Sequence, residues 1–201
     1  MSLTMARRAL HDSDTILDAA RSLLLRAGIE STTVQAIAAE SGAPVGSLYN
    51  RFGSRGALLA QLWVRAAERS QAACLPALAL DEPIEAAVEA ARSLVRFTRE
   101  QPDDARLLAS HRRDELLAGA EGTAVAATLR TLNAPVEAAL KQLSRRLFGD
   151  ARAEHVARVG LAILDVPLAA VQRYLRSGQR VPSQLDVYVT RAVRAILEDD
   201  R

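Results

Sequence analysis

The sequence contains little cysteine, few aromatic residues and few histidines. Its 201 residues include one cysteine, three histidines and 3% aromatic residues. One cysteine excludes a disulfide within the chain, and the widely separated histidines do not form a metal-site pattern with it. Neither a glycine-rich phosphate loop nor a nucleophile motif is present. These absences argue against an enzyme, and we expect the protein to need no metal and no cofactor.

Long hydrophobic runs and β-strand patterns are also absent. No apolar run reaches the ~18–20 residues that cross a membrane, and charges interrupt the N-terminal residues where a secretory signal would lie. Alternating runs of β-branched residues are almost missing, while the helix-favouring residues Ala, Leu, Arg and Glu are abundant. We therefore predict an all-α, soluble protein of the bacterial cytoplasm that does not enter a membrane.

The chain lacks a strong excess of either charge. Its formal net charge is +2, and the first 60 residues contain six arginines against five acidic residues. Any binding to nucleic acid therefore has to come from the local placement of a few side chains, because the overall charge does not supply it.

Helical periodicity runs through most of the chain and predicts about nine helices. They are expected at residues 13–27, 32–41, 44–52, 54–75, 83–101, 103–117, 123–148, 151–177 and 183–197. Pro76 and the Asp81-Glu82-Pro83 stretch are expected to break the fourth helix, and Pro135 and Pro167 to kink the seventh and eighth. The first three helices are predicted to share one core, formed by Ile16, Leu23, Leu24, Ile29, Val34, Ile37, Leu48 and Phe52.

The second and third of these helices are short and joined by a tight turn. Thr32 and Gln35 have the spacing of a capping box, and Gly42 suits the left-handed end of the helix that follows them. Leu48 and Phe52 lie four residues apart, on one face of the next helix. This pattern predicts a helix-turn-helix, in which the second helix enters the major groove of DNA.

The same stretch matches a family pattern. The matching positions are Thr32-Thr33-Val34, Ile37-Ala38, Ser41–Tyr49, Phe52, Ser54-Arg55 and Leu58-Leu59. At these spacings they resemble the signature of TetR-family transcriptional regulators, and the resemblance covers roughly residues 10–63. It implies a DNA-binding domain at residues 1–53 and a helical ligand-binding and dimerisation domain at residues 54–201. It also implies a homodimer, most often a repressor, that a small molecule releases from a quasi-palindromic operator and that associates with the nucleoid when bound to DNA.

Each predicted DNA contact has a chemical reason and, in several cases, a structural alternative. Asn50 suits adenine, and Arg51 suits guanine or a phosphate. The hydroxyl of Tyr49 can reach a phosphate, or the ring can simply pack. Thr32 and Thr33 lie at a helix N-terminus, which favours a phosphate, or they only cap the helix. The full set of predicted contacts is Thr32, Thr33, Pro44, Val45, Gly46, Ser47, Tyr49, Asn50, Arg51 and Arg55, the last as a phosphate clamp.

The remaining ~140 residues are expected to bind the ligand and to form the dimer. Residues 151–177 and 183–197 carry more apolar surface than one domain covers, and a two-fold four-helix bundle would bury it. The predicted interface residues are Val166, Val171, Leu175, Tyr188, Val189, Val193 and Ile196. The ligand is expected to be apolar or amphipathic. Its predicted contacts are polar or bulky residues on apolar faces: Trp63, Phe97, His111, Arg112, Asp114, Gln172 and Tyr174.

One alternative function follows from departures from the family pattern. Pro44, Asn50, Arg51 and Gly56 stand where the family commonly has other residues. A helical interaction module that has lost DNA binding would also show such changes. Replacing Tyr49 and Arg55 by Ala would weaken DNA binding in a regulator and change nothing in such a module.

Overall fold

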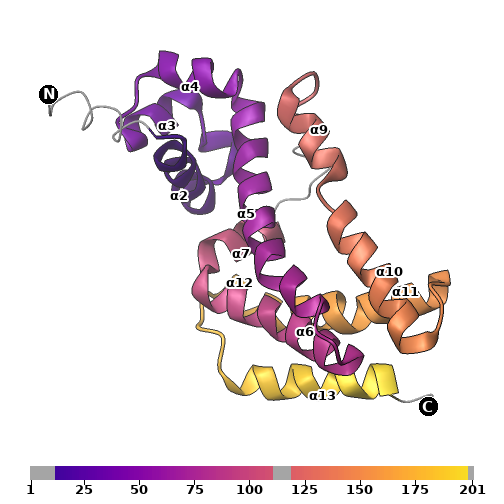
Figure 1. Ribbon diagram of the computed structural model, residues 1–201. Coiled ribbons are helices and arrows are strands. Elements are labelled where there is room, and N and C mark those ends of the chain that lie inside the picture. The colour runs from indigo at the N-terminus through magenta and orange to yellow at the C-terminus, as the bar shows by residue number, and fades with distance from the viewer. Residues whose placement is uncertain (1–11, 111–118, 199–201) are drawn as a thin grey trace, which may run out of the picture. The chain divides into compact units, whose positions relative to one another are not determined.

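The computed structural model describes residues 12–110 and 119–198, and the described residues form helices and no strand (Figure 1). The all-α prediction is therefore confirmed. Contacts between residues divide the chain into two compact units. Unit 1 comprises residues 1–66 and 110–131, and unit 2 comprises residues 67–109 and 132–201. No described helix has the length and hydropathy that a membrane crossing requires.

Unit 1 contains the predicted helix-turn-helix. Its helices are α2 (Ser13–Ser31), α3 (Val34–Ser41), α4 (Val45–Phe52), α9 (Ala124–Thr131) and the first half of α5 (Arg55–Leu78). Helix α3 packs against both α2 and α4. The buried side chains come from one stripe of each helix and include Ile16, Leu23, Leu24, Val34, Ile37, Leu48, Leu58 and Leu62. Most of the predicted small core is thus confirmed.

The joint between α2 and α3 differs from the prediction in two ways. Gly28 has a φ of 79°, so α2 leaves helical geometry there. This turn carries Ile29 away from the apolar stripe of α2, and Ile29 is exposed rather than in the core. The N-cap of α3 is Thr33, whose hydroxyl accepts a hydrogen bond from the Ala36 N–H at 3.1 Å. The predicted capping box beginning at Thr32 is therefore wrong by one residue.

Unit 2 is arranged around α6 (Pro83–Glu100). Helix α6 packs against α10 (Ala134–Phe148), α12 (Val166–Ser177), α13 (Gln184–Glu198) and the π-helical turn η1 (Leu161–Asp165). Its inner face carries small side chains, which allow close approach of several neighbours. They are Ala86, Ala87, Ala90 and Ala91, all fully buried. The unit is completed by α7 (Pro102–Ser110), α11 (Ala153–Gly160) and the second half of α5.

The three prolines within predicted helices have three different effects. Helix α5 continues through Pro76 to Leu78, so the predicted break at Pro76 is wrong. Pro135 lies in the first turn of α10, where its missing N–H costs nothing, and the chain is divided into α9 and α10 rather than kinked. Pro167 follows η1, where the Val166 N–H bonds to the Leu161 carbonyl in place of a regular α-helical bond.

The turn between α10 and α11 is held by polar contacts around Asp150. Its carboxylate accepts hydrogen bonds from the Arg152 N–H at 3.0 Å and from His155 Nδ1 at 2.7 Å. Its carbonyl accepts from the hydroxyl of Ser144, which is buried. The bond from the Arg152 backbone and the bond from His155 both favour the carboxylate and hold the pKa of Asp150 below its ordinary value.

We predict that Asp150→Asn lowers the melting temperature at neutral pH. Because the pKa of Asp150 is lowered in the folded state, the carboxylate stabilises the fold fully at pH values above the ordinary aspartate pKa. It is lost as the pH falls through the folded pKa. The melting curves of wild type and variant should therefore converge in acid. Glu154→Gln, an exposed carboxylate in the first turn of α11, is the control and should differ little from wild type at any pH. A difference in melting temperature between wild type and Asp150→Asn that stays constant across the pH series would contradict this role of the Asp150 carboxylate.

Candidate nucleic-acid interface

Helix α4 presents an exposed face of mixed chemistry. Val45, Gly46, Tyr49, Asn50 and Arg51 are all exposed, and 48% of the Tyr49 surface is accessible. The side chains of Tyr49 and Asn50 make no hydrogen bond within the described residues. A hydroxyl, an amide, a guanidinium and a short aliphatic group thus lie on the outer face of eight residues of helix. These groups are able to bind phosphates, base edges and thymine methyl groups.

The opposite side of α4 fixes the helix within unit 1. Leu48 is almost completely buried. The helix ends at Gly53, which has a φ of 75° and whose N–H bonds to the Tyr49 carbonyl at 2.8 Å. Arg51 Nη1 donates to the Ser13 hydroxyl at 3.1 Å, which ties the end of α4 to the beginning of α2. The exposed face therefore has a defined orientation. Two further predicted contacts lie here: Ser47 on α4 is half-buried, and Pro44, the residue just before α4, is exposed.

The structure separates the roles of the two threonines before α3. Thr33 is exposed at the N-terminus of α3, so its predicted contact with a phosphate is compatible with its capping bond. Thr32 is completely buried, and its hydroxyl donates to the Gly28 carbonyl at 2.8 Å. Its side chain has no surface for DNA, and the prediction that it contacts DNA is wrong. In the sequence the two threonines look equivalent. The turn at Gly28 buries one hydroxyl and exposes the other, and the sequence pattern does not reveal that turn.

Arg55 does not extend into solvent as a phosphate clamp would. Its Nε donates to the Thr32 carbonyl at 2.7 Å, and its Nη2 donates to the Ile29 carbonyl. Both acceptors lie in the joint between α2 and α3. The predicted clamp is thus committed to the protein backbone in this structure.

An ion pair missed by the sequence analysis links α5 to α2. Arg65 Nη1 lies 2.7 Å from an Asp14 carboxylate oxygen, and Nη2 lies 2.7 Å from Asp18. The two acids are four residues apart and so share one face of α2. The signal in the sequence is this spacing, together with an arginine inside the apolar run of α5. Arg65 therefore bridges two carboxylates of α2 and orients α5 against that helix.

A close backbone contact also fixes the first turn of α5. A Cβ atom added to Gly56 would lie 1.6 Å from the Gly119 carbonyl oxygen, so no larger residue fits without a backbone shift. Both residues belong to unit 1. The departure from the family pattern at Gly56 therefore has a local structural reason, and is not by itself a sign that DNA binding is lost.

The predicted ligand contacts are divided between the two units and the residues outside the described part of the chain. Trp63 lies in unit 1, whereas Phe97, Gln172 and Tyr174 lie in unit 2. Phe97 and Tyr174 are buried and Gln172 is exposed, although it is only two residues from Tyr174. The predicted contacts His111, Arg112 and Asp114 lie outside the described residues.

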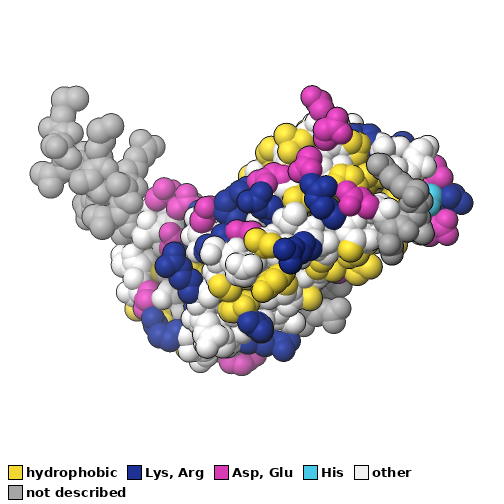
Figure 2. Space-filling model, turned by 90° about the horizontal axis from the view of Figure 1, so that it is seen from below, with side chains coloured by type: hydrophobic (Ala, Val, Ile, Leu, Met, Phe, Trp, Pro, Cys, Tyr) yellow, Lys and Arg dark blue, Asp and Glu magenta, His cyan; other side chains and the backbone are white. Residues whose placement is uncertain are grey.

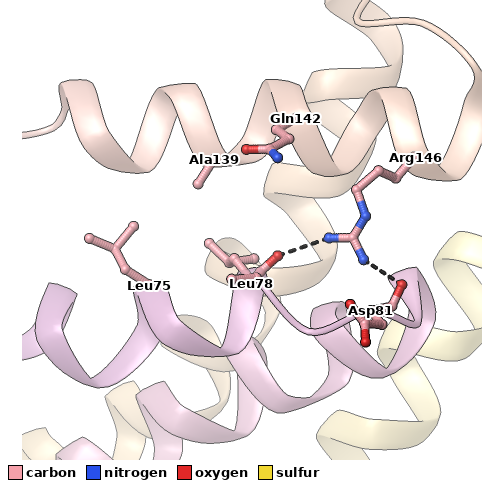
Figure 3. Close-up of a pocket in the computed structure, with 7 residues that line it drawn as sticks. Leu75, Leu78, Asp81, Ala139, Gln142 and Arg146 are labelled. Carbon is pink, nitrogen blue, oxygen red and sulfur yellow. Dashed lines mark hydrogen bonds between the residues drawn. The ribbon is translucent and has the colours of Figure 1, made fainter.

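Unit 2 contains a groove that the sequence analysis did not predict. It has a volume of about 400 Å³ and lies between the end of α5 and α10 (Figure 3). Arg146 donates to the Leu78 carbonyl at 3.0 Å and to the Asp81 carbonyl at 2.8 Å, which closes one end. The lining is half apolar and half polar: Leu75, Leu78, Ala79, Asp81, Ala139, Gln142 and Arg146. The helix predicted from the sequence ended before Pro76, whereas α5 continues to Leu78, which lines the groove.

The predicted dimer residues divide between the core and the surface. Val171, Val189 and Val193 pack inside the core of unit 2 and are at most 1% exposed, so they have no surface for a partner. Their inclusion was wrong because the apolar stripe of each helix serves the subunit's own core. Tyr188 is 58% exposed, while Val166, Leu175 and Ile196 are half-buried or exposed at the edge of that core. The other large exposed apolar residues on α13 and the η1–α12 segment are Leu161, Leu168 and Val187.

Comparison with known proteins identifies the family of the DNA-binding helices. Residues 16–62 match the family model of the bacterial regulatory proteins of the tetR family. The matched segment runs from α2 through α3 and α4 into the first half of α5. The match supports a DNA-binding helix-turn-helix within these residues. Among curated proteins, none matches the chain.

Solved structures of bacterial regulators share the fold over most of the chain. PfmR from Thermus thermophilus is 20% identical, with a TM-score of 0.66 over 91% of this chain and 97% of that one. A regulator from Marinobacter aquaeolei is 16% identical, with a TM-score of 0.70 over 96% and 98%. The fatty acid degradation regulator FadR from Bacillus halodurans is 14% identical, with a TM-score of 0.70 over 92% and 94%.

We predict that Gly56→Ala destabilises unit 1. The added methyl group meets the Gly119 carbonyl, and overpacking of this kind costs about 1–3 kcal/mol. Gly46→Ala is the matched control, because Gly46 is also helical and has open space around it. That change should be neutral or stabilising by up to about 1 kcal/mol. Denaturant unfolding measures both. Equal effects of the two substitutions would contradict the close contact.

Proposed function

We propose that this TetR-family protein is a dimeric repressor that binds a quasi-palindromic operator and is released from it by a small molecule. The observation that carries the proposal is the exposed polar face of α4, held in place by the buried Leu48. The protein would act in the bacterial cytoplasm, on the nucleoid, where its operator lies. The family match and the shared fold support the proposal.

The exposed face of α4 provides both positioning and base-reading groups. Asn50 can bond an adenine edge through two hydrogen bonds, and Val45 can contact a thymine methyl group. Arg51 reaches a guanine or a phosphate if it releases the Ser13 hydroxyl. The Tyr49 hydroxyl binds a phosphate, as does the exposed N-terminus of α3 at Thr33.

The dimer would form through an apolar face of unit 2 that the subunit leaves uncovered. Leu161 and Leu168 are both exposed in the continuous η1–α12 segment, at 46% and 51% of their surface. Val187 and Tyr188 are exposed on α13. Figure 2 shows hydrophobic patches on the surface among closely mixed basic and acidic side chains. A two-fold dimer would cover such a face and place two α4 helices on half-sites about one turn apart.

The groove between α5 and α10 is the best-supported ligand site. Its volume of about 400 Å³ lies within the ordinary range for small-molecule sites. Leu75, Leu78 and Ala139 offer apolar contact, and Gln142 offers an amide at the wall. An amphipathic molecule fits this lining. Because α5 runs from unit 1 into unit 2, a shift at its end would be transmitted along one continuous helix to Arg55, which follows closely after α4.

An electrophoretic shift with intergenic DNA beside its own gene tests the proposed function. At moderate salt we expect a specific shifted band that unlabelled competitor of the same sequence removes and random DNA does not. Failure to shift any nearby intergenic region specifically would count against a DNA-binding repressor and favour an interaction module.

We predict that Asn50→Ala weakens binding to the shifted DNA by about 1–3 kcal/mol, the usual value of a good bidentate base contact. The melting temperature should not change, because the Asn50 side chain is exposed and makes no bond within the described residues. Asn133→Ala removes another exposed asparagine, on unit 2, and should bind DNA like wild type. If both variants bind equally well, Asn50 does not read a base.

We predict that Leu168→Arg converts the dimer into monomers, because it places a charge in the centre of the uncovered apolar face. Leu80→Arg is the matched control, since Leu80 is also large, apolar and exposed in unit 2 but lies outside α12 and α13. Sedimentation velocity across a concentration series measures both. A dimer that persists in Leu168→Arg and is lost in Leu80→Arg would show that the interface lies around Leu80 and not around Leu168.

A further inference from the structure

Arg55 joins two parts of unit 1 that are far apart in sequence. At Gly28 the backbone of α2 leaves helical geometry, and a short helical segment continues beyond this kink to Ser31. The carbonyls of Ile29 and Thr32 then face the first turn of α5, where Arg55 donates to both. The Nε–O distance to Thr32 is 2.7 Å. The two bonds span 23 and 26 residues of chain.

The acceptor side of this junction is itself fixed. Thr32 is completely buried, and its hydroxyl bonds to the Gly28 carbonyl at 2.8 Å. Its N–H bonds to the Ile29 carbonyl at 3.2 Å. The next residue, Thr33, caps α3. The carbonyls that Arg55 binds therefore belong to a tight turn that determines where α3 begins.

The donor side is directly connected to α4. Only Gly53 and Ser54 separate the end of α4 from Arg55. Ser54 caps α5, because its hydroxyl accepts from the Ala57 N–H at 3.1 Å. Helix α4 is thus held between α3 on one side and the anchored first turn of α5 on the other. The angle at which its exposed face meets DNA depends on both anchors.

We infer that Arg55 is a positioning residue for DNA reading, which sets α4 against α3 by binding the Ile29 and Thr32 carbonyls and does not hold a phosphate. The inference rests on the proposed function, because it concerns how the proposed reading helix is placed. Reaching out to a phosphate would break both carbonyl bonds and release the first turn of α5.

The side chain suits this task better than lysine would. Nε–H and Nη2–H lie on one rigid edge of a planar guanidinium and meet two acceptors at once. A lysine ammonium carries the same charge but is a single point donor on a flexible stem. A phosphate contact tolerates that exchange, whereas a contact with two fixed carbonyls does not. Arg55→Lys therefore separates the two roles.

The test compares Arg55→Lys and Arg55→Gln with wild type on two DNA probes. One probe is a duplex that the wild-type protein selects from a random-sequence library, and the other is random duplex DNA. Dissociation constants are measured over a series of salt concentrations, at a temperature where circular dichroism shows all proteins folded. For both variants we expect the specific affinity to fall by about tenfold, since misplacing α4 loses base contacts, while random-duplex affinity and salt slope stay unchanged.

Two control variants calibrate the measurement. Arg51→Gln removes a proposed contact with DNA on α4 itself; if that contact is a phosphate, the salt slope falls by about 0.9. Arg26→Gln breaks a surface ion pair with Glu40 in the same unit and should change neither affinity nor slope. A role confined to folding would lower the melting temperature of the Arg55 variants but leave the ratio of specific to random-duplex affinity unchanged.

Each outcome decides the inference. It is supported when both Arg55 variants show a smaller ratio of specific to random-duplex affinity than wild type and the same salt slope. It is overturned when Arg55→Lys restores wild-type binding and Arg55→Gln weakens both probes with a smaller slope, because that is a phosphate clamp. It is also overturned when the ratio does not change. If wild type selects no duplex at all, the proposed function fails first, and that failure is distinct from failure of the Arg55 assignment.

Discussion

A helix of eight residues is not stable by itself in water, and α4 has eight residues. Its structure and orientation therefore come from what holds it. Leu48 anchors its inner side in the core, Gly53 ends it, and Arg51 ties its last turn to Ser13. This dependence leaves the outer side available, because none of the anchors uses the side chains of Tyr49 or Asn50. The reading face is exposed because other residues hold the helix.

The same constraint explains why the first turn of α5 has so many backbone contacts. Arg55 binds two carbonyls and Gly56 lies directly against the Gly119 backbone. Farther along the helix, Arg65 binds two carboxylates of α2. All of these contacts lie within unit 1, and all fix α5 to the elements around α4. Because α5 continues into unit 2, the helix proposed to carry the ligand signal also supports α4.

Local patterns in the sequence predicted the parts of the structure that local physics determines. The ends of helices at Gly42 and Gly149, and the buried Leu48, follow from backbone conformation and apolar spacing. The roles of Thr32 and Arg55 did not follow, because they depend on partners that the turn at Gly28 brings close. Residues 23 or 26 positions apart have no pattern that shows such a bond. The family resemblance likewise suggested a clamp where the structure shows a backbone contact.

The proposed dimer face shows a second limit of predictions from helical periodicity. Helices α12 and α13 are apolar on more than one side, and an apolar stripe does not reveal whether it covers the subunit's own core or a partner. Val193 lies in the core, while Leu168, from an equally apolar pattern, lies on the surface. The groove beside Arg146 was missed for a related reason, since it depends on where α5 ends, and Pro76 in its last turn does not end it.

Hydrogen–deuterium exchange of the full chain, with and without a duplex that it selects from a random-sequence library, tests the central claim most directly. A short helix held only by its neighbours opens locally, so its amides exchange readily in the free protein. The account predicts that DNA slows exchange in residues 45–51 and at the N-terminus of α3, and leaves α13 unchanged. Selection of no sequence, or protection that spares α4, would contradict it.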